Sequence, residues 1–365
     1  MHLVSLTITD FRNISGLHLE PDPRGTTVIT GLNGAGKTSV LEAVAYLATL
    51  NSFRHSPKEA LIRRGAESAI LRAQTVVDGR DLTIEAEVSA AGRSRTQVNR
   101  QPVRRRIDLH DALRTTVFSP EDIGMVRGGP AERRRFLDET LAVVEPKAAR
   151  SSEEVEKILR QRSALLRRSG RRLSGEAAVT LDVWDDRLDA AGTTLVEARE
   201  SLVDDLTPLV AAHYARLAGR PTAVALGYRR SWSGRLLEAL GGSRAADLER
   251  GVSTIGPHRD EMELSLEGLP GRTHASQGEQ RSLALALQLA AHQLATERLG
   301  SAPVLLLDDV FSELDPLRCR ALLDGLPPGQ TLLTTALAPP EEVSASMVYA
   351  VAGGSHVTPV APDPD

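Results

Sequence analysis

Cysteine is almost absent from this chain, because Cys319 is the only one among 365 residues. A single thiol cannot close a disulfide within the chain, and such scarcity fits a reducing compartment. The sequence also has no run of about 18 apolar residues, which a membrane-spanning helix would need. Its first residues, MHLVSLTITDF, lack the basic end and the long apolar run of a signal peptide. We therefore expect a cytoplasmic protein without a membrane partner.

Aromatic residues and net charge are also low. Phe, Trp and Tyr make up 3% of the chain, so the core must consist of Leu, Val, Ala and Ile, and aromatic platforms for stacking single-stranded bases are scarce. The 44 basic and 48 acidic residues leave a net charge of −4. The chain as a whole is therefore not a polycation, and any nucleic-acid binding must come from a local basic surface.

Lysine is rare too, since only four of the basic residues are lysines. One of them, Lys37, lies in GLNGAGKT at residues 31–38, which matches the phosphate-loop pattern G-x-x-x-x-G-K-[ST]. The TTVIT run before it predicts a strand, and the apolar spacing after it predicts a helix. A glycine-rich turn that happens to contain a lysine is the alternative, and this strand–loop–helix context argues against it. We expect phosphate contacts from Gly31, Leu32, Asn33, Gly34, Ala35, Gly36, Lys37 and Thr38, with the Thr38 hydroxyl on magnesium.

An acidic motif lies far downstream, where PVLLLDD at residues 303–309 predicts a buried strand that ends in two carboxylates. Asp308 can reach a magnesium ion directly or through water, and Asp309 can hold and deprotonate an attacking water. Alone, such a run is a weak signal. The acidic motif lies between two other motifs. SQGEQ at residues 276–280, at the start of a predicted helix, comes before it, and SELD at residues 312–315 comes after it. The ordered set of four motifs is far more specific than any one of them.

The order of the predicted elements indicates an α/β fold whose nucleotide-binding core is split into two sequence-distant halves. We expect these halves in residues 1–128 and 251–365, with a helical insert at residues 129–250. Within the insert, residues 147–168 and 176–217 carry long amphipathic patterns, which predict a short antiparallel helical hairpin. An ordinary helical subdomain without a special role is the alternative for most of these residues.

Together, the motifs resemble the head of the ABC-type ATPases, a phosphate-loop fold with a mixed sheet core and an antiparallel β region. The finer resemblance is to the RecF family, bacterial recombinational-repair proteins of the SMC-like branch of that class. It covers nearly the whole chain. The segments that carry it are FRN at 11–13, GLNGAGKTSVLEA at 31–43, FSPEDIGMVRGGPAERRRFLD at 118–138, GPHRDE at 256–261, SQGEQRSLALAL at 276–287 and LLLDDVFSELD at 305–315.

The resemblance implies that ATP with Mg²⁺ is held between two copies of the chain, as an ATP-dependent homodimer. On one copy, the implied site contains Lys37 and Thr38 at the phosphates, Thr38 and Asp308 at the metal, Lys37 and Asp309 as catalytic residues, and Arg12 and Asn13 near the base or ribose. On the other copy, it contains Ser276 and Gly278. Because Asp309 is shorter than the glutamate that most ABC ATPases have here, we expect slow hydrolysis.

Two usual features of the ABC class are missing. No glutamine occurs in residues 118–125, where the loop that joins the two lobes is expected, and Glu121 is the nearest polar substitute. Thr334 and Thr335 stand where many ABC proteins have a switch histidine. Both departures concern how the γ-phosphate would be sensed.

Arginine clusters are the candidates for DNA binding, because spaced arginines give a salt-sensitive affinity for phosphates that does not depend on sequence. We single out Arg104, Arg105 and Arg106. The other clusters are Arg93, Arg95 and Arg100, Arg133 to Arg135, and a group expected at the hairpin tip, namely Arg160, Arg162, Arg167, Arg168, Arg171 and Arg172. The alternative is a solvated, ion-paired surface, and Arg134 and Arg135 fit a structural role better. For His258 and Arg259 we expect a contact between lobes rather than a metal.

By similarity, we expect a weak, DNA-stimulated ATPase in which ATP switches dimerisation. It would bind double-stranded DNA or a single/double-strand junction and, with RecR and RecO, help to load RecA at replication gaps. Three other classes remain open: an ABC transporter-type subunit, an SMC-like structural DNA clamp, and a partner-binding module with an inactive nucleotide site. The hairpin between the motifs argues against a transporter subunit, and its short length argues against an SMC-like clamp. The intact motif residues argue against an inactive nucleotide site.

Overall fold

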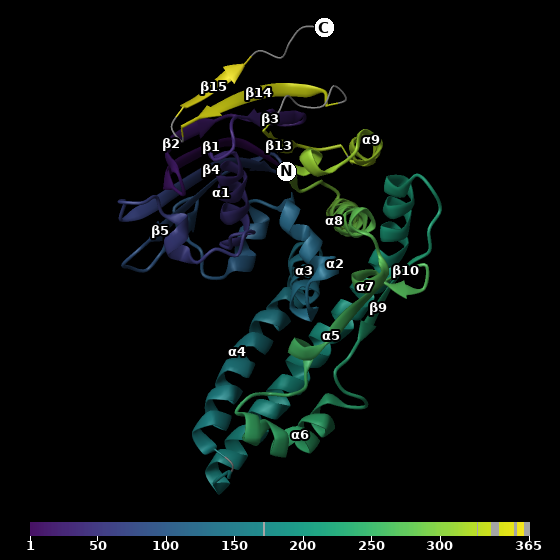
Figure 1. The fold of residues 1–365 in the computed structure, drawn as a ribbon. Coiled ribbons are helices and arrows are strands. Elements are labelled where there is room, and N and C mark those ends of the chain that lie inside the picture. Colours follow the sequence, from purple (N-terminus) through teal and green to yellow (C-terminus); the bar gives the residue numbers. More distant parts are fainter. Residues whose placement is uncertain (171, 327, 337–342, 354–355, 361–365) are drawn as a thin grey trace. The chain divides into compact units, whose positions relative to one another are not determined.

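The computed structural model describes residues 1–170, 172–326, 328–336, 343–353 and 356–360, and its elements follow the order shown in Figure 1. It consists of two compact units, each assembled from separate parts of the sequence. Unit 1 contains Met1–Asp122, Ala215–Arg220 and Leu285–Asp365, and unit 2 contains Ile123–Tyr214 and Pro221–Ala284. The three ranges proposed from the sequence, 1–128, 129–250 and 251–365, stay a prediction.

Unit 1 contains two six-stranded sheets. The first is antiparallel, in the order β2 (Ile14–Leu19), β1 (His2–Phe11), β4 (Ser68–Val77), β5 (Arg80–Ser89), β6 (Arg95–Val98) and β7 (Gln101–Pro102). The second is mixed, in the order β15 (His356–Val360), β14 (Ala345–Ala352), β3 (Thr26–Thr30), β13 (Thr331–Thr335), β12 (Val304–Asp308) and β8 (Thr115–Phe118). Among the strands that the structure describes in this sheet, only β15 pairs antiparallel. The predicted combination of a mixed sheet core with an antiparallel β region is thus confirmed.

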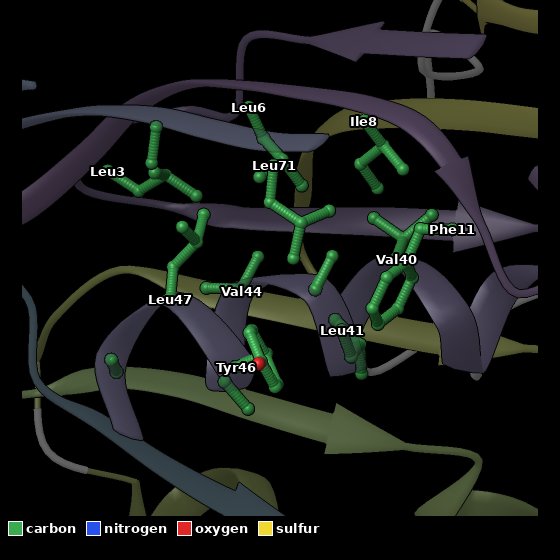
Figure 2. Close-up of a cluster of buried hydrophobic side chains, with 14 of the residues drawn as sticks. Leu3, Leu6, Ile8, Phe11, Val40, Leu41, Val44, Tyr46, Leu47 and Leu71 are labelled. Carbon is green, nitrogen blue, oxygen red and sulfur yellow. The ribbon is translucent and has the colours of Figure 1, made fainter. Parts of the chain in front are cut away.

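Helix α1 (Lys37–Thr49) forms the centre of unit 1 and contacts strands of both sheets. All of its residues except Thr38 and Thr49 are buried, as expected of a helix that is apolar on most sides. Figure 2 shows Val44 and Leu47 of this helix beside Leu3, Leu6 and Leu71 from strands of the antiparallel sheet. This packing holds α1 from both sides and so fixes the loop that precedes it.

Unit 2 is mainly helical and contains one three-stranded sheet. The sheet has the order β11 (Leu269–Pro270), β10 (Glu261–Leu266) and β9 (Val224–Arg229). The helices are α2 (Gly124–Arg127), α3 (Pro130–Val144), α4 (Pro146–Ser169), α5 (Gly175–Ala218), α6 (Leu236–Arg250), α7 (Gly271–His274) and α8 (Gln277–Leu299), of which α5 and α8 end within unit 1. Unit 1 also contains α9 (Pro316–Gly325). The 3-10 helices are η1 (Lys58–Leu61), η2 (Arg106–Asp111), η3 (Pro120–Ile123), η4 (Pro257–Arg259) and η5 (Val310–Glu313).

The predicted helical hairpin is present as α4 and α5. The two helices lie side by side and run in opposite directions in Figure 1. Helix α4 ends at Ser169, and Gly170 takes a positive φ of 59°, where a residue without a side chain is favoured. An ion pair of 2.6 Å between Arg187 and Glu154 links the two helices.

One of the arginines that we expected at the hairpin tip, Arg162, is buried. The Arg162 side chain is completely buried, so its expected exposure is wrong. Since residues four apart share a helix face, Arg162 falls on the same buried face of α4 as Ile158 and Leu166. Arg160, Arg167, Arg168 and Arg172 are exposed, and Arg171 lies outside the described residues.

Several elements were not expected from the sequence. Among them are α6, which contains the pair Gly241-Gly242 and therefore lacks a strong helical pattern, the strands β14 and β15, and the short helices α2 and α7. Within the described ranges, no helix has both the length and the apolar character needed to cross a membrane.

Candidate nucleotide-binding site

The phosphate loop connects β3 to α1, and its glycines have conformations that other residues would disturb. A Cβ atom at Gly31 would lie 2.4 Å from the Val351 carbonyl oxygen of β14. Gly36 has a φ of 112°, and a Cβ there would lie 3.1 Å from Asn13 Oδ1. The glycines at these two positions therefore let the loop pass between a neighbouring strand and Asn13.

Lys37 points back into the loop. Its Nζ donates hydrogen bonds to the carbonyl oxygens of Gly31 (2.8 Å) and Leu32 (3.2 Å), and the residue is buried. By contrast, Leu32, Asn33 and Gly34 are exposed. The ammonium group is therefore held on the inner side of a loop whose outer residues face solvent, which is where the sequence pattern places a phosphate partner.

Asp308 ends β12 and accepts hydrogen bonds from two hydroxyls. Thr38 Oγ1 and Thr334 Oγ1 each donate to Asp308 Oδ1 at 2.8 Å. Asp308 is 4% exposed, and this burial raises the pKa of its carboxyl group. The two hydroxyl hydrogen bonds act in the opposite direction, while the negative charges of Glu121 and Asp309 raise the pKa further. The carboxylate is thus buried among neutral donors and negative neighbours.

This arrangement fits a magnesium ion that arrives with a nucleotide. The Thr38 hydroxyl and the Asp308 carboxylate are hard oxygen ligands, and Mg²⁺ is commonly held by one or two carboxylates together with substrate phosphates. Within the described residues, no group of three or more His, Cys, Asp or Glu side chains could hold a metal alone. Phosphate oxygens would have to supply further ligands.

Asp309 follows immediately and has a different environment. Its φ of 48° lies in the left-handed region, which aspartate tolerates better than most residues, and its backbone N–H donates to Thr334 Oγ1 at 3.0 Å. In the parts of the chain that the structure describes, no hydrogen bond reaches its carboxylate. The two neighbouring acids therefore differ: Asp308 is fixed by hydroxyls, and the Asp309 carboxylate is available for a small ligand such as water.

Arg12 and Asn13 lie in the turn between β1 and β2. Asn13 Nδ2 donates to the Gly34 carbonyl oxygen at 2.8 Å, so this side chain supports the phosphate loop. Arg12 forms an ion pair with Glu42 of α1, a residue with no exposed surface, and also donates to Ser56 Oγ. Both residues thus brace the loop and its helix. Their expected place near the base or ribose stays a prediction.

The SQGEQ segment at residues 276–280, which we call the signature motif or signature turn, lies in unit 2 at the start of α8. The Ser276 backbone N–H donates to Glu279 Oε2 at 2.8 Å and the Glu279 backbone N–H donates to Ser276 Oγ at 3.4 Å, which is the reciprocal arrangement of a helix capping box. The Ser276 hydroxyl also donates to Glu279 Oε2 at 2.8 Å. Ser276 is exposed and Gly278 is partly exposed. The motif therefore presents the N-terminus of a long helix, which attracts anions. Each motif is described within its own unit, so the pairing of Lys37 with Ser276 of a second copy stays a prediction.

The arginines proposed for DNA binding are only partly described. Arg104 and Arg105 are exposed just before η2. The side chain of Arg106 is not among the side chains that the structure describes. Arg133 differs from this group because it is buried and pairs with Glu261 at 2.7 Å. Arg134 donates to the Asp260 carbonyl oxygen, in line with the structural role expected for it.

His258 is partly buried within unit 2, where its Nε2 lies 3.0 Å from the Ser253 carbonyl oxygen. Burial lowers its pKa to about 4, and the positive charges of Arg259, Arg134 and Arg162 act in the same direction. The ring is therefore neutral at physiological pH and hydrogen-bonded within unit 2. The contact between lobes that we expected for it stays a prediction.

Thr334 is the residue whose role the sequence did not reveal. It was noted only as a replacement for a switch histidine, yet it donates to Asp308 and accepts from the Asp309 backbone. The available signal was a polar pair, Thr334 and Thr335, that ends an apolar strand. Parallel strands place such ends at one edge of a sheet, beside the ends of β12 and β3.

Comparison with known proteins shows similarity to RecF proteins over nearly the whole chain. A family model described as "RecF/RecN/SMC N terminal domain" matches residues 2–332. The DNA replication and repair protein RecF of Frankia alni is 41% identical over 377 residues, covering 97% of this chain and 98% of that protein. Its counterpart from Kineococcus radiotolerans is 40% identical over 385 residues, covering 98% of each.

Solved structures give the same result. A structure of the recombination mediator protein RecF with ATP, from the RecFOR pathway, has a TM-score of 0.89 and 27% identity, covering 99% of this chain and 98% of that one. An SMC head bound to the C-winged helix domain of ScpA has a TM-score of 0.58 at 15% identity, which shows a shared fold alone. The fold is thus that of an ABC-type ATPase head, and the chain belongs to the RecF family.

Proposed function

We propose that this protein is an ATP-binding and ATP-hydrolysing DNA-repair protein with a RecF-like role in recombinational repair. The observation that carries the nucleotide site is Asp308, a buried carboxylate fixed by Thr38 of the phosphate-loop helix and by Thr334. This contact joins the two motifs that a Mg²⁺–nucleotide complex requires, although they lie 270 positions apart in the sequence. The similarity to proteins named for DNA replication and repair supports the cellular role.

In this proposal, each residue of unit 1 has one task. Lys37 moves from the loop carbonyls to the outer phosphates, and Thr38 and Asp308 hold Mg²⁺. The bound ion would neutralise charge that develops on the β- and γ-phosphates. Asp309 positions the attacking water. Because an aspartate reaches less far than a glutamate, hydrolysis is slow, and the ATP-bound state persists long enough to act as a timed switch.

ATP also controls association between two copies of the chain. A γ-phosphate on the phosphate loop of one copy meets the N-terminus of α8, with Ser276, on its partner. ADP lacks the group that makes this contact, so ATP favours the dimer and hydrolysis releases it. The dimer binds double-stranded DNA or a single/double-strand junction through phosphate contacts, for which Arg104, Arg105 and Arg106 are the candidates. By similarity, RecR, RecO and RecA are its partners.

The test measures particle mass and DNA affinity together. The protein is sized by sedimentation with ATP and Mg²⁺, with ADP and without nucleotide, each with and without a duplex. We expect a dimer with ATP and Mg²⁺, which the duplex favours further. With ADP or without nucleotide, we expect a monomer. Fluorescence anisotropy of a labelled duplex should show tighter binding with ATP than with ADP. A monomer at saturating ATP, Mg²⁺ and duplex would contradict the proposal.

A further inference from the structure

Arg127 connects the short helix α2 to the signature turn within unit 2. Its Nε donates to Gln280 Oε1 at 2.5 Å. Gln280 is buried, and its Nε2 donates to the carbonyl oxygens of Gly271 (3.2 Å) and Arg272 (3.1 Å). One buried amide thus links the start of α7, the start of α8 and an arginine from outside the motif. Ser276 lies in the turn that this amide closes.

Arg133 fixes α2 from the other side. Its Nη1 donates to the carbonyl oxygens of Met125 (3.1 Å) and Gly128 (3.0 Å), at the end of α2. Its Nε and Nη2 donate to the two carboxylate oxygens of Glu261, at 2.7 and 3.0 Å. Such a bidentate pair restrains the orientation of the arginine as well as its position.

Glu261 is itself held in place, because it begins β10 and follows a buried aspartate. Asp260 accepts hydrogen bonds from the Tyr228 hydroxyl and the Ser231 backbone, both at 2.8 Å. On α5, Arg199 donates to the Pro257 carbonyl oxygen at 2.8 Å. A continuous series of contacts therefore runs from α5 and the start of β10, through the two arginines, to the signature turn.

We propose that Arg127 and Arg133 are positioning residues for the signature turn: they set the place of Ser276 without touching nucleotide, and ATP-dependent association of two copies depends on them. This inference rests on the proposed function, because it needs the signature turn to meet ATP on a second copy. Ser276 is exposed and its own partner, Glu279, lies in the same turn. The link from that turn to α2 is the Arg127–Gln280 hydrogen bond.

Arg127→Ala is the first variant, and it is a mild one for folding because Arg127 is exposed. We expect the ATP affinity of the monomer to stay within about twofold. The dissociation constant of the dimer with ATP should rise by about tenfold or more, the effect of losing one hydrogen bond to a charged group. Arg127→Lys keeps a charged donor and should restore much of the association. Arg250→Ala, an exposed arginine of α6, is the matched control and should leave both measurements unchanged.

Gln280→Met separates this role from a general effect on folding. It keeps the length of the side chain and removes the amide, so it should weaken dimers as Arg127→Ala does. If both residues act through one hydrogen bond, the double variant will be no weaker than the worse single variant. Additive losses would overturn the inference, as would an Arg127→Ala variant that dimerises with ATP as well as the unaltered chain. If the unaltered chain does not dimerise with ATP, the proposed function itself fails.

Discussion

Two buried carboxylate sites, one in each unit, have different hydrogen-bond partners. In unit 2, Asp185 and Asp247 have almost no exposed surface, and both pair with the buried guanidinium of Arg162, at 2.8 and 2.6 Å. In unit 1, Asp308 is buried to a similar degree but accepts its hydrogen bonds from Thr38 and Thr334. Among the described residues, no cation pairs with it.

At these two sites, the difference separates an acid that is already paired with a cation from one that is not. A buried charge is costly unless it is paired, so a carboxylate that already has its cation is complete. Asp308 has neutral donors instead, and its pKa is raised by burial. Such a group is a favourable ligand for a cation that comes and goes with the nucleotide. The contrast leads to the following predictions, in order of decreasing effect.

Arg162→Ala should have the largest effect, on stability. It leaves Asp247 buried without a cation and Asp185 paired with Arg244 alone, and breaking a buried pair typically costs about 3–5 kcal/mol. We expect the free energy of unfolding, followed by helix content in urea, to fall by this amount. Arg168→Ala changes an exposed arginine of the same helix and should alter it little. If the two variants unfold alike, Asp185 and Asp247 do not need Arg162.

Asp308→Asn should leave the stability of the nucleotide-free protein intact and should remove its stabilisation by nucleotide. It removes the negative charge but keeps an acceptor for the threonine hydroxyls, so the nucleotide-free protein should lose no stability. The stabilisation by ATP and Mg²⁺, about 2.7 kcal/mol at a hundredfold excess over the dissociation constant, should disappear. Thermal unfolding with and without ATP and Mg²⁺ measures both effects. A variant that ATP and Mg²⁺ still stabilise fully would show that Asp308 is not a ligand.

The pH dependence gives a second measurement on the same pair of proteins. Because the folded state raises the pKa of Asp308 above its ordinary value of 3.8, the ionised carboxylate opposes folding. The cost of the ionised carboxylate to folding is absent below pH 3.8. It grows as the pH rises from there through the folded-state pKa. We therefore expect the unaltered chain to lose stability relative to Asp308→Asn between acidic and neutral pH, without nucleotide. Parallel stability curves would contradict this.

Thr334→Val should have a smaller effect, of about 1.5 kcal/mol, because it removes one hydroxyl hydrogen bond to the Asp308 carboxylate and one acceptor for the Asp309 backbone. Hydrolysis should slow more than ATP binding weakens, since Asp309 loses its support. The ATP dissociation constant and the turnover number measure the two effects separately. Equal changes in both would mean that Thr334 does not position Asp309.

Arg104→Gln combined with Arg105→Gln should have the smallest effect, confined to DNA. An arginine that neutralises one DNA phosphate contributes about 0.9 to the slope of log affinity against log salt, so the loss of two such contacts should make the slope shallower by about 1.8. Arg72→Gln is the control, since Arg72 is also exposed but already pairs with Glu85 of the neighbouring strand. An unchanged slope for the double variant would exclude these two arginines from the DNA interface.

Much of the fold could be predicted because its signals are local. The strand before the phosphate loop, the helix after it and the hairpin with its break at Gly170 each follow from a period, a glycine or a charge pattern. The strands β14 and β15 were missed although the sequence has a turn signal between them, the pair Gly353-Gly354. Helix α6 was missed because Gly241 and Gly242 obscure its helical pattern.

The site could be predicted residue by residue where a motif names the residue. Lys37, Thr38 and Asp308 are such cases, and the structure brings the last two within hydrogen-bond distance. Contacts between distant segments carry no such signal. Nothing in the sequence near Arg162 indicates Asp247 as its partner, and the polar end of the strand at Thr334 does not by itself identify Asp308. These pairs arise from tertiary packing, which local patterns do not encode.

The most direct test of the composite nucleotide site mixes two inactive variants. Lys37→Ala lacks the phosphate-loop ammonium, and Ser276→Arg blocks the signature turn, so neither should dimerise alone with ATP and Mg²⁺. A mixed dimer would still contain one intact site, formed by Lys37 of one copy and Ser276 of its partner. We predict that sedimentation of the mixture shows a dimer with one bound ATP. A mixture that stays monomeric, while the unaltered chain dimerises, would contradict a site shared between two copies.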